Sequence, residues 1–147
     1  MNGKVFLDTN ILMYAHDASQ GDKHSRARTL LDDLWSSRLG VLSTQVLQEF
    51  AFNLRRRMSP PVSAAETRNW ISAYLAWEVV VNTPNAVLRA LEIEERYRIS
   101  FWDALVVQAA QTAAVDTIYS EDLSDGQIYG SARVINPFKG NGVQRDR

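Results

Sequence analysis

Four acidic residues stand where carboxylates can do chemistry: Asp8, Glu49, Asp103 and Asp122. Asp8 directly follows the apolar run at residues 5–7, and Asp122 comes three residues after the run at 117–119. In open parallel sheets, ligands bind beyond the carboxyl ends of neighbouring strands, so these two side chains are expected to face one crevice. Carboxylates crowded together are unfavourable unless a cation lies among them. The four acids together therefore predict a site for one or two divalent metal ions.

The ligand types available in the chain narrow the choice of ion. The 147 residues include no cysteine, which excludes both disulfides and thiolate metal sites. The two histidines, His16 and His24, follow no metal-ligand spacing. Carboxylate oxygens suit Mg²⁺ or Mn²⁺, which keep part of their water shell and bind substrate phosphates. We therefore expect Mg²⁺ or Mn²⁺ as the cofactor.

Each acid also has a purely structural explanation. Asp8 fits the N-cap of a following helix, because Asp is a favoured capping residue. Asp103 stands three residues after a serine, in the spacing of a capping box. Glu49 lies beside an apolar helical stripe, where an ion pair with a nearby arginine would explain it. Asp122 and Asp125 both fit a turn, which is the preferred interpretation for Asp125 because Gly follows it. The metal site is thus a hypothesis about four residues taken together.

The elements that must position these acids alternate along the chain. Short apolar runs separated by longer helical patterns predict an α/β fold, a three-layer α/β/α sandwich around a mainly parallel five-stranded sheet. The expected strands are residues 4–7, 41–43, 78–82, 117–119 and 133–135. If the first strand is central, Asp8 lies at the crevice where ligands bind.

Helix signals fill the segments between the predicted strands. Apolar residues at three- and four-residue spacing predict amphipathic helices at 26–39 and 44–58, while 100–114 is apolar on most sides and predicts a buried helix. Ser63 and Glu66 form a capping box, and Thr83 precedes a proline at a first helical position. Gly40 is predicted to end one helix and begin a strand.

Length and composition indicate one domain. With 46% hydrophobic residues, the chain can close a single core over residues 1–139, and residues 140–147 lack hydrophobic anchors and are expected to form a frayed tail. No stretch approaches the roughly 20 apolar residues that span a bilayer, and no signal peptide is evident. We expect a cytoplasmic protein without a membrane partner. A net charge of −1 means that binding to nucleic acid must depend on local basic patches.

Several motifs carry a resemblance to a known family. They are the stretches at residues 5–12, 48–50, 101–105 and 119–123, which read VFLDTNIL, QEF, FWDAL and YSEDL. In this order and spacing they resemble the PIN-domain nucleases, and among these the VapC-type toxins of bacterial toxin–antitoxin pairs. The resemblance extends over about residues 4–138, nearly the whole chain.

The resemblance implies an endoribonuclease that hydrolyses RNA phosphodiester bonds with a divalent metal ion, the cation making an attacking water more acidic. It implies catalytic roles for the four acids, with Asp8, Glu49 and Asp103 on the metal and Asp122 supporting the site. Thr9, Asn10 and Ser120 are polar residues expected to support the cluster. It also implies a cognate antitoxin protein that fills the active-site groove, often with a basic side chain, and a homodimer.

An acidic cleft repels RNA phosphates, so basic residues must line its rim. Arg55, Arg56 and Arg57 follow Glu49 within about two helical turns and are predicted to form this rim. Four aromatic residues could stack on bases, although helical spacing favours the core for such residues: Trp70, Tyr74, Trp77 and Trp102.

Three other functions compete with a ribonuclease. An aspartate-nucleophile phosphotransferase would want a second carboxylate two residues after Asp8, where Asn10 stands. A receiver-like signalling module would want adjacent acids after the first strand and a lysine near the last one, whereas Lys139 lies beyond it. A PIN-fold binding module with little turnover remains open. The sequence also leaves open whether Glu121 or Asp125 belongs to the site.

Overall fold

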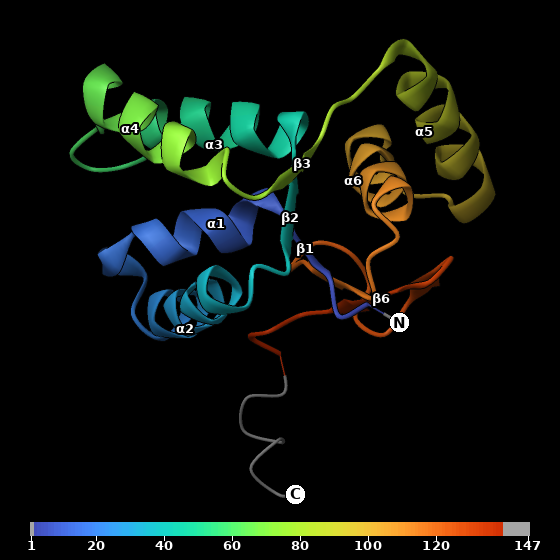
Figure 1. The fold of residues 1–147 in the computed structure, drawn as a ribbon, viewed down its shortest axis with the longest axis horizontal. Coiled ribbons are helices and arrows are strands. Elements are labelled where there is room, and N and C mark those ends of the chain that lie inside the picture. The colour runs from blue at the N-terminus through green and yellow to red at the C-terminus, as the bar shows by residue number, and fades with distance from the viewer. Residues whose placement is uncertain (1, 140–147) are drawn as a thin grey trace, which may run out of the picture.

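The computed structural model describes residues 2–139, which form an α/β/α sandwich (Figure 1). Its strands are β1 (Val5–Leu7), β2 (Gly40–Ser43), β3 (Glu78–Val80), β4 (Thr117–Tyr119), β5 (Ile128–Tyr129) and β6 (Ala132–Ile135). They form one sheet in the order β3-β2-β1-β4-β6-β5, parallel except for the β5–β6 pair. The predicted fold class is confirmed. The domain boundary predicted after residue 139 and the tail at 140–147 lie outside the described residues.

The sheet has six strands where five were predicted. The additional strand, β5, pairs antiparallel with β6 over only two residues. Its two-residue connection begins at Gly130, whose φ of 63° suits a tight hairpin. So short a strand has no periodicity of its own, and the sequence pattern therefore missed it.

Helices cover both faces of the sheet. The helices are α1 (Thr9–His16), a 3₁₀ turn (Ala18–Gln20), α2 (Asp22–Ser37), α3 (Thr44–Arg56), α4 (Ala64–Tyr74), α5 (Pro84–Tyr97) and α6 (Phe101–Thr112). The first four α-helices lie on one side of the sheet, and α5 and α6 lie on the other (Figure 1). No helix in the described part of the chain is long and apolar enough to cross a membrane.

The predicted helix starts are confirmed where a capping residue marked them. Ser63 and Thr83 cap α4 and α5 through their hydroxyls, which accept hydrogen bonds from the backbone N–H groups three residues later. The prediction for Gly40 was half wrong, because α2 already ends at Ser37 and Arg38 takes the left-handed conformation with φ 63°. Gly40 instead begins β2, where a Cβ atom would lie 2.3 Å from the Trp77 ring. A close approach rather than a helix end requires this glycine.

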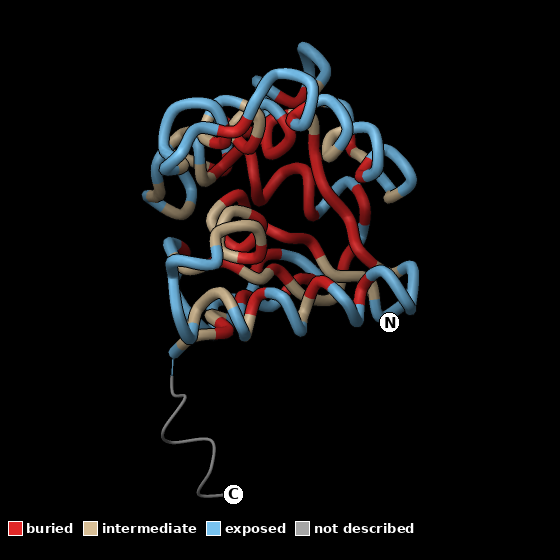
Figure 2. The backbone as a smooth tube through the Cα atoms, turned by 90° about the vertical axis from the view of Figure 1, so that its left-hand side faces the viewer, coloured by how far each residue is buried: buried red, intermediate tan, exposed pale blue. Residues whose placement is uncertain are grey.

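The core lies between the layers, with buried backbone through the middle of the molecule and exposed backbone along the outer helices (Figure 2). The helix predicted to be buried is α6, in which seven consecutive residues from Ala104 to Ala110 are buried. Strand β1 pairs with β2 on one side and β4 on the other. The connections from β1 lie on one face of the sheet and α5 and α6 on the other, so the carboxyl ends of β1 and β4 border a crevice suited to a ligand.

Candidate active site

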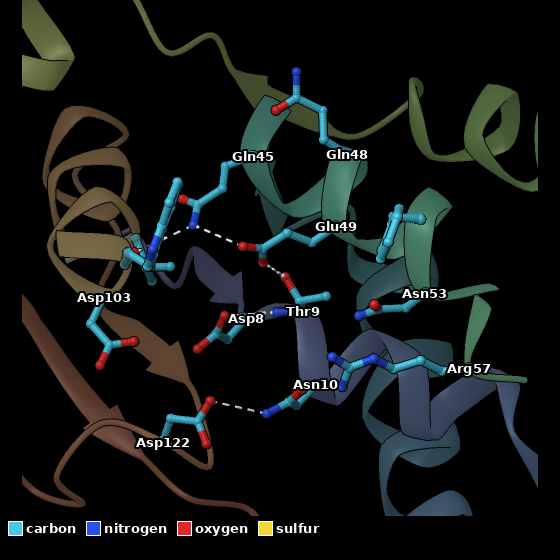
Figure 3. A pocket seen from close by; sticks show the side chains of 13 residues that line it. Asp8, Thr9, Asn10, Gln45, Gln48, Glu49, Asn53, Arg57, Asp103 and Asp122 are labelled. Atoms are coloured by element: carbon cyan, nitrogen blue, oxygen red, sulfur yellow. Dashed lines mark hydrogen bonds between the residues drawn. The ribbon is translucent and has the colours of Figure 1, made fainter. Parts of the chain in front are cut away.

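A pocket of about 450 Å³ opens at the carboxyl ends of β1 and β4, and all four predicted acids line it (Figure 3). Asp8 follows β1, Glu49 comes from the second turn of α3, Asp103 from the first turn of α6, and Asp122 from the turn after β4. Residues separated by more than 100 positions in the sequence thus share one cavity. The fold brings together the acids that the sequence singled out.

Asp8 acts as a helix cap and as a wall of the pocket at once. Its Oδ1 accepts a hydrogen bond from the Thr9 backbone N–H at 2.8 Å, and its Oδ2 accepts one from the Ser120 hydroxyl at 2.9 Å. The side chain is buried, and burial raises its pKa to about 6, with the charges of Asp122 and Asp103 acting in the same direction. The capping role and the site role are therefore compatible.

Glu49 is held at both carboxylate oxygens. The Thr9 hydroxyl donates to Oε1 at 2.6 Å, and the Gln45 amide donates to Oε2 at 3.3 Å. The same Gln45 nitrogen lies 3.3 Å from the Trp102 carbonyl oxygen in the first turn of α6. Gln45 thereby links the helix that carries Glu49 to the helix that carries Asp103. The carboxylate of Glu49 faces the centre of the pocket in a fixed orientation (Figure 3).

The other two acids differ in how they are held. Ser100 caps α6 by accepting a hydrogen bond from the Asp103 N–H at 3.0 Å, and the Ser100 side chain also interacts with the Asp103 carboxylate. Burial, and then the charges of Asp122 and Glu49, raise the pKa of Asp103. The Asp122 carboxylate accepts a hydrogen bond from the Asn10 amide at 3.0 Å. Each of the four acids thus has a polar neighbour within the chain.

Ser120 connects the two strand ends. It is fully buried, and its hydroxyl donates to Asp8 while accepting hydrogen bonds from the N–H groups of Asp122 at 3.2 Å and Leu123 at 3.1 Å. One hydroxyl therefore sets both the orientation of Asp8 and the turn that carries Asp122.

The donor set fits a hard cation with its own water. Within residues 2–139, no three His, Cys, Asp or Glu side chains converge as a ready set of ligands for one ion. Mg²⁺ does not need such a set, because it is commonly bound by one or two carboxylates while water completes the octahedron. The pocket would offer such an ion oxygen donors only, and a bound cation would offset the burial and the mutual repulsion that raise the pKa values of Asp8 and Asp103.

The three predicted basic residues do not lie together. Arg57 lines the acidic pocket, whereas Arg55 and Arg56 line a separate depression with Ala51 and Thr67. Phe52 lies at the edge of both, and the Arg56 guanidinium lies 5.4 Å from its ring centre. Among the described lining residues, Arg57 is the one cationic group in the acidic pocket.

Sequence reasoning missed part of the pocket wall. Gln45, Gln48, Phe52, Asn53 and Val106 line it as well. The signal for two of them was present, because residues 45, 49 and 53 follow one another at four-residue spacing, which places Gln45 and Asn53 on one face of α3 with Glu49.

Two neighbouring acids lie outside the pocket. The Glu121 carboxylate forms an ion pair with Lys23 and accepts a hydrogen bond from the Tyr14 hydroxyl at 2.7 Å. Asp125 accepts a hydrogen bond from the Asn136 N–H at 2.9 Å, as expected for a residue that stabilises a turn. Neither lines the cavity that holds the four acids.

The aromatic residues separate into two groups. Tyr74 is buried, and Trp70 and Trp77 are half-buried against the core, as their helical spacing predicts. Trp102 is 62% exposed and lines the acidic pocket.

Comparison with known proteins identifies the fold family. The model of the PIN domain family matches residues 5–124. The chain belongs to this family. The predicted PIN-domain resemblance is thereby confirmed, and the match includes the segments that carry all four acids of this PIN domain. A comparison with curated protein sequences gave no match.

Solved structures with the same fold include several toxins. The PIN domain superposes on a crystal structure of Mycobacterium tuberculosis VapC20, described as a sarcin-ricin loop cleaving toxin, with a TM-score of 0.66 and 23% identity, covering 88% of this chain and 99% of that one. A toxin–antitoxin complex from Klebsiella pneumoniae gives 0.65 and 15%, covering 92% and 98%. VapBC2 from Rickettsia felis, bound to a promoter DNA fragment, gives 0.59 and 16%, covering 88% and 96%. At these identities the likeness shows the fold.

Proposed function

We propose that this PIN domain is a Mg²⁺- or Mn²⁺-dependent endoribonuclease and the toxin of a toxin–antitoxin pair. The observation that carries the proposal is the single pocket in which Asp8, Glu49, Asp103 and Asp122 meet at the carboxyl ends of β1 and β4. Structures with the same fold support the proposal, because one is described as a sarcin-ricin loop cleaving toxin and another as a toxin–antitoxin complex.

In this proposal Asp8, Glu49 and Asp103 hold the ion, directly or through the water that completes its shell, and Asp122 supports the site. A bound divalent ion would make water a better nucleophile and offset negative charge on the phosphate. The residues of this chain supply the pre-organisation: Ser120 and the Thr9 N–H orient Asp8, and the Thr9 hydroxyl with Gln45 orients Glu49. Both carboxylates are thus aimed before RNA arrives.

The proposed partners of the acidic pocket are RNA and an antitoxin protein. RNA is the substrate, and a cognate antitoxin with a basic side chain would silence the enzyme by placing that charge among the four acids. Structures of toxin–antitoxin complexes with the same fold support the antitoxin as a partner. A homodimer and a cytoplasmic location belong to the same proposal.

The test compares the wild type with Asp8→Asn and Asp103→Asn on structured RNA in Mg²⁺, in Mn²⁺ and in EDTA. Cleavage is expected for the wild type with metal alone, since each variant removes one negative charge from the ion's surroundings. Asp33→Asn is the matched control, because Asp33 is an exposed acid on α2 outside the pocket. Calorimetric titration with Mn²⁺ should show weaker binding for both site variants and unchanged binding for the control.

Cleavage that persists in EDTA, or that Asp8→Asn retains, would sink the proposal. Metal binding without turnover on any RNA would instead identify a binding module that keeps the acidic site. A covalent aspartyl phosphate trapped on Asp8 would identify a phosphotransferase.

A further inference from the structure

Trp102 is a large aromatic side chain that lies outside the hydrophobic core. It is the second residue of α6, directly before Asp103, and 62% of it is exposed although it lines the acidic pocket. The Gln45 amide fixes its backbone carbonyl, and the Phe101 ring meets it edge-on at 5.3 Å. An indole held this way at the margin of the acids presents a flat apolar surface to whatever enters the pocket.

Arg57 is a cation in the same pocket that no acid neutralises. It caps the end of α3, and its guanidinium makes no hydrogen bond or ion pair with any residue from 2 to 139, although four carboxylates line the same cavity. Its side chain reaches toward Asn10, on the other side of Asp8 from Asp103 (Figure 3). The guanidinium is therefore available to an anion from outside the protein.

The cavity continues beyond Arg57. A second depression of about 190 Å³ is lined mainly by polar groups, among them Tyr14, Gln20 and the acid Asp17, and it shares Asn10, Asn53 and Arg57 with the acidic pocket. The two cavities therefore adjoin at these shared residues and together are called the path, with Trp102 at the first cavity and Arg57 at the junction. A chain-like ligand can follow this path past the acids.

We propose that this path binds an unpaired RNA strand, with one base stacked on Trp102, the reacting phosphate at the acids and a neighbouring phosphate on Arg57. The proposal rests on the ribonuclease function proposed above, and it adds a role in substrate binding for two residues outside the acids, Trp102 and Arg57. Bases in a duplex are stacked on each other and hydrogen-bonded, so only an unpaired base can lie on the indole. Stacking accepts any base, and the planar guanidinium suits a phosphate through two parallel hydrogen bonds.

The charges favour RNA over a peptide as the occupant of the whole path. A basic peptide would pair with the four acids but be repelled by Arg57, and an acidic peptide would pair with Arg57 but be repelled by the acids. A strand of RNA suits both regions, because a phosphate can share a divalent ion with carboxylates while its neighbour pairs with arginine.

The experiment measures binding separately from cleavage. In the Asp8→Asn background with Mg²⁺, fluorescence anisotropy compares a labelled, unstructured RNA of about 12 nucleotides, a length typical of single-strand binding sites, with the same strand annealed to its complement. The single strand is expected to bind at least about tenfold more tightly than the duplex. Trp102→Ala should weaken single-strand binding by about tenfold, a typical effect of losing one base stack, and Trp102→Phe should restore most of it.

Arg57→Ala should weaken binding of every RNA sequence alike and lower the salt dependence of the affinity by about one phosphate contact. The matched control is Arg68→Ala, which removes one exposed positive charge from α4, outside both cavities. It should leave the affinity and its salt dependence unchanged. Circular dichroism and thermal unfolding of each variant verify that it is folded.

Wild-type affinity in folded Trp102→Ala, or preference for the duplex, would overturn the proposal. So would a Trp102→Ala variant with a changed oligomeric state and unchanged RNA affinity, because Trp102 would then belong to a protein interface. Cleavage by the wild type without the expected binding pattern refutes the strand path alone. The expected binding pattern without any cleavage leaves the path intact and refutes the ribonuclease function.

Discussion

Each end of α1 has an ionisable side chain whose pKa is shifted by burial, but the surroundings of the two side chains differ. At the first end Asp8 is buried, and burial raises its pKa to about 6. At the last turn His16 is largely buried, and burial lowers its pKa to about 4. In both cases loss of water disfavours the charged form. The helix therefore has a group driven toward neutrality at either end.

The surroundings of each group determine whether its shifted pKa marks a site. His16 is neutral at pH 7, its Nε2 shares a 2.6 Å hydrogen bond with the Tyr74 hydroxyl, and the Trp70 and Phe50 rings lie 4.5 and 5.1 Å away. Asp8 instead has Asp103 and Asp122 as charged neighbours in an open pocket. A shifted pKa alone thus does not identify a site. The site is where further carboxylates surround the buried group in an open pocket.

The largest effect expected from this contrast is on catalysis. Asp8→Asn should lower the rate of metal-dependent RNA cleavage on the order of 10³-fold, since an ion supplies several kcal/mol of transition-state stabilisation. His16→Gln should leave the rate within about twofold, because an amide can replace the hydrogen bond to Tyr74 far from the acids. Single-turnover cleavage assays on both variants measure this difference. Equal losses would show that the contrast between the two ends is mistaken.

Ser120→Ala tests the hydrogen bonds that pre-organise the acidic end. The substitution leaves Asp8 Oδ2 and the N–H groups of Asp122 and Leu123 without their hydroxyl partner in a fully buried position. Each unsatisfied group costs about 1–3 kcal/mol, so with partial relaxation we expect the free energy of unfolding to fall by about 2–3 kcal/mol.

The control for this change is Ser131→Ala. Ser131 is exposed, and its hydroxyl makes one hydrogen bond, to the Val115 carbonyl. Urea unfolding should place its loss below about 1 kcal/mol. Equal losses for the two serines would mean that Ser120 has no special part in holding the strand ends.

Much of the acidic end could be predicted from sequence, because local rules and the site coincide there. Asp8 both ends an apolar strand and caps a helix, and parallel strands necessarily place their carboxyl ends on the same edge. Helix starts marked by Ser63 and Thr83 were predictable for the same reason, since a cap acts within one turn.

The rest depends on tertiary packing that short-range patterns do not encode. Trp102 and Tyr74 both lie in helices, yet one is 62% exposed and the other 2%, because their burial is set by which helix face meets another layer. The three consecutive arginines are distributed around the end of α3, so that only Arg57 among them lines the acidic pocket. The two residues of β5 are a strand only because they pair with β6, and no local pattern predicts that pairing.

The stability of the metal-free protein should respond to pH in opposite directions at the two ends of α1. The pKa of His16 is lowered from 6.5 to about 4, so its contribution to stability is present above pH 6.5 and is lost as pH falls toward 4. The pKa of Asp8 is raised from 3.8 to about 6, so its contribution is present below pH 3.8 and is lost as pH rises through 6. Between pH 4 and 6 the two contributions oppose each other.

Replacing either residue should therefore leave the pH dependence of stability that the other residue causes. In EDTA, Asp8→Asn should make the unfolding temperature rise more steeply with pH between 4 and 6.5, whereas His16→Gln should make it rise less steeply or fall. Thermal unfolding in half-unit pH steps measures both slopes. Parallel profiles for the two variants would contradict the opposite burial effects.

The smallest expected effect tests whether the hydrogen bond between Tyr74 and His16 contributes to stability without affecting the acidic pocket. Tyr74→Phe removes only the hydroxyl that pairs with His16 Nε2, and a neutral hydrogen bond contributes about 0.5–1.5 kcal/mol. A double-mutant cycle with His16→Phe should give a coupling of that size, measured by urea unfolding. Neither variant should change RNA cleavage or Mn²⁺ affinity, because this end satisfies its buried polar groups within the chain. A coupling near zero would mean that packing of the rings, rather than the hydrogen bond, is what keeps His16 neutral.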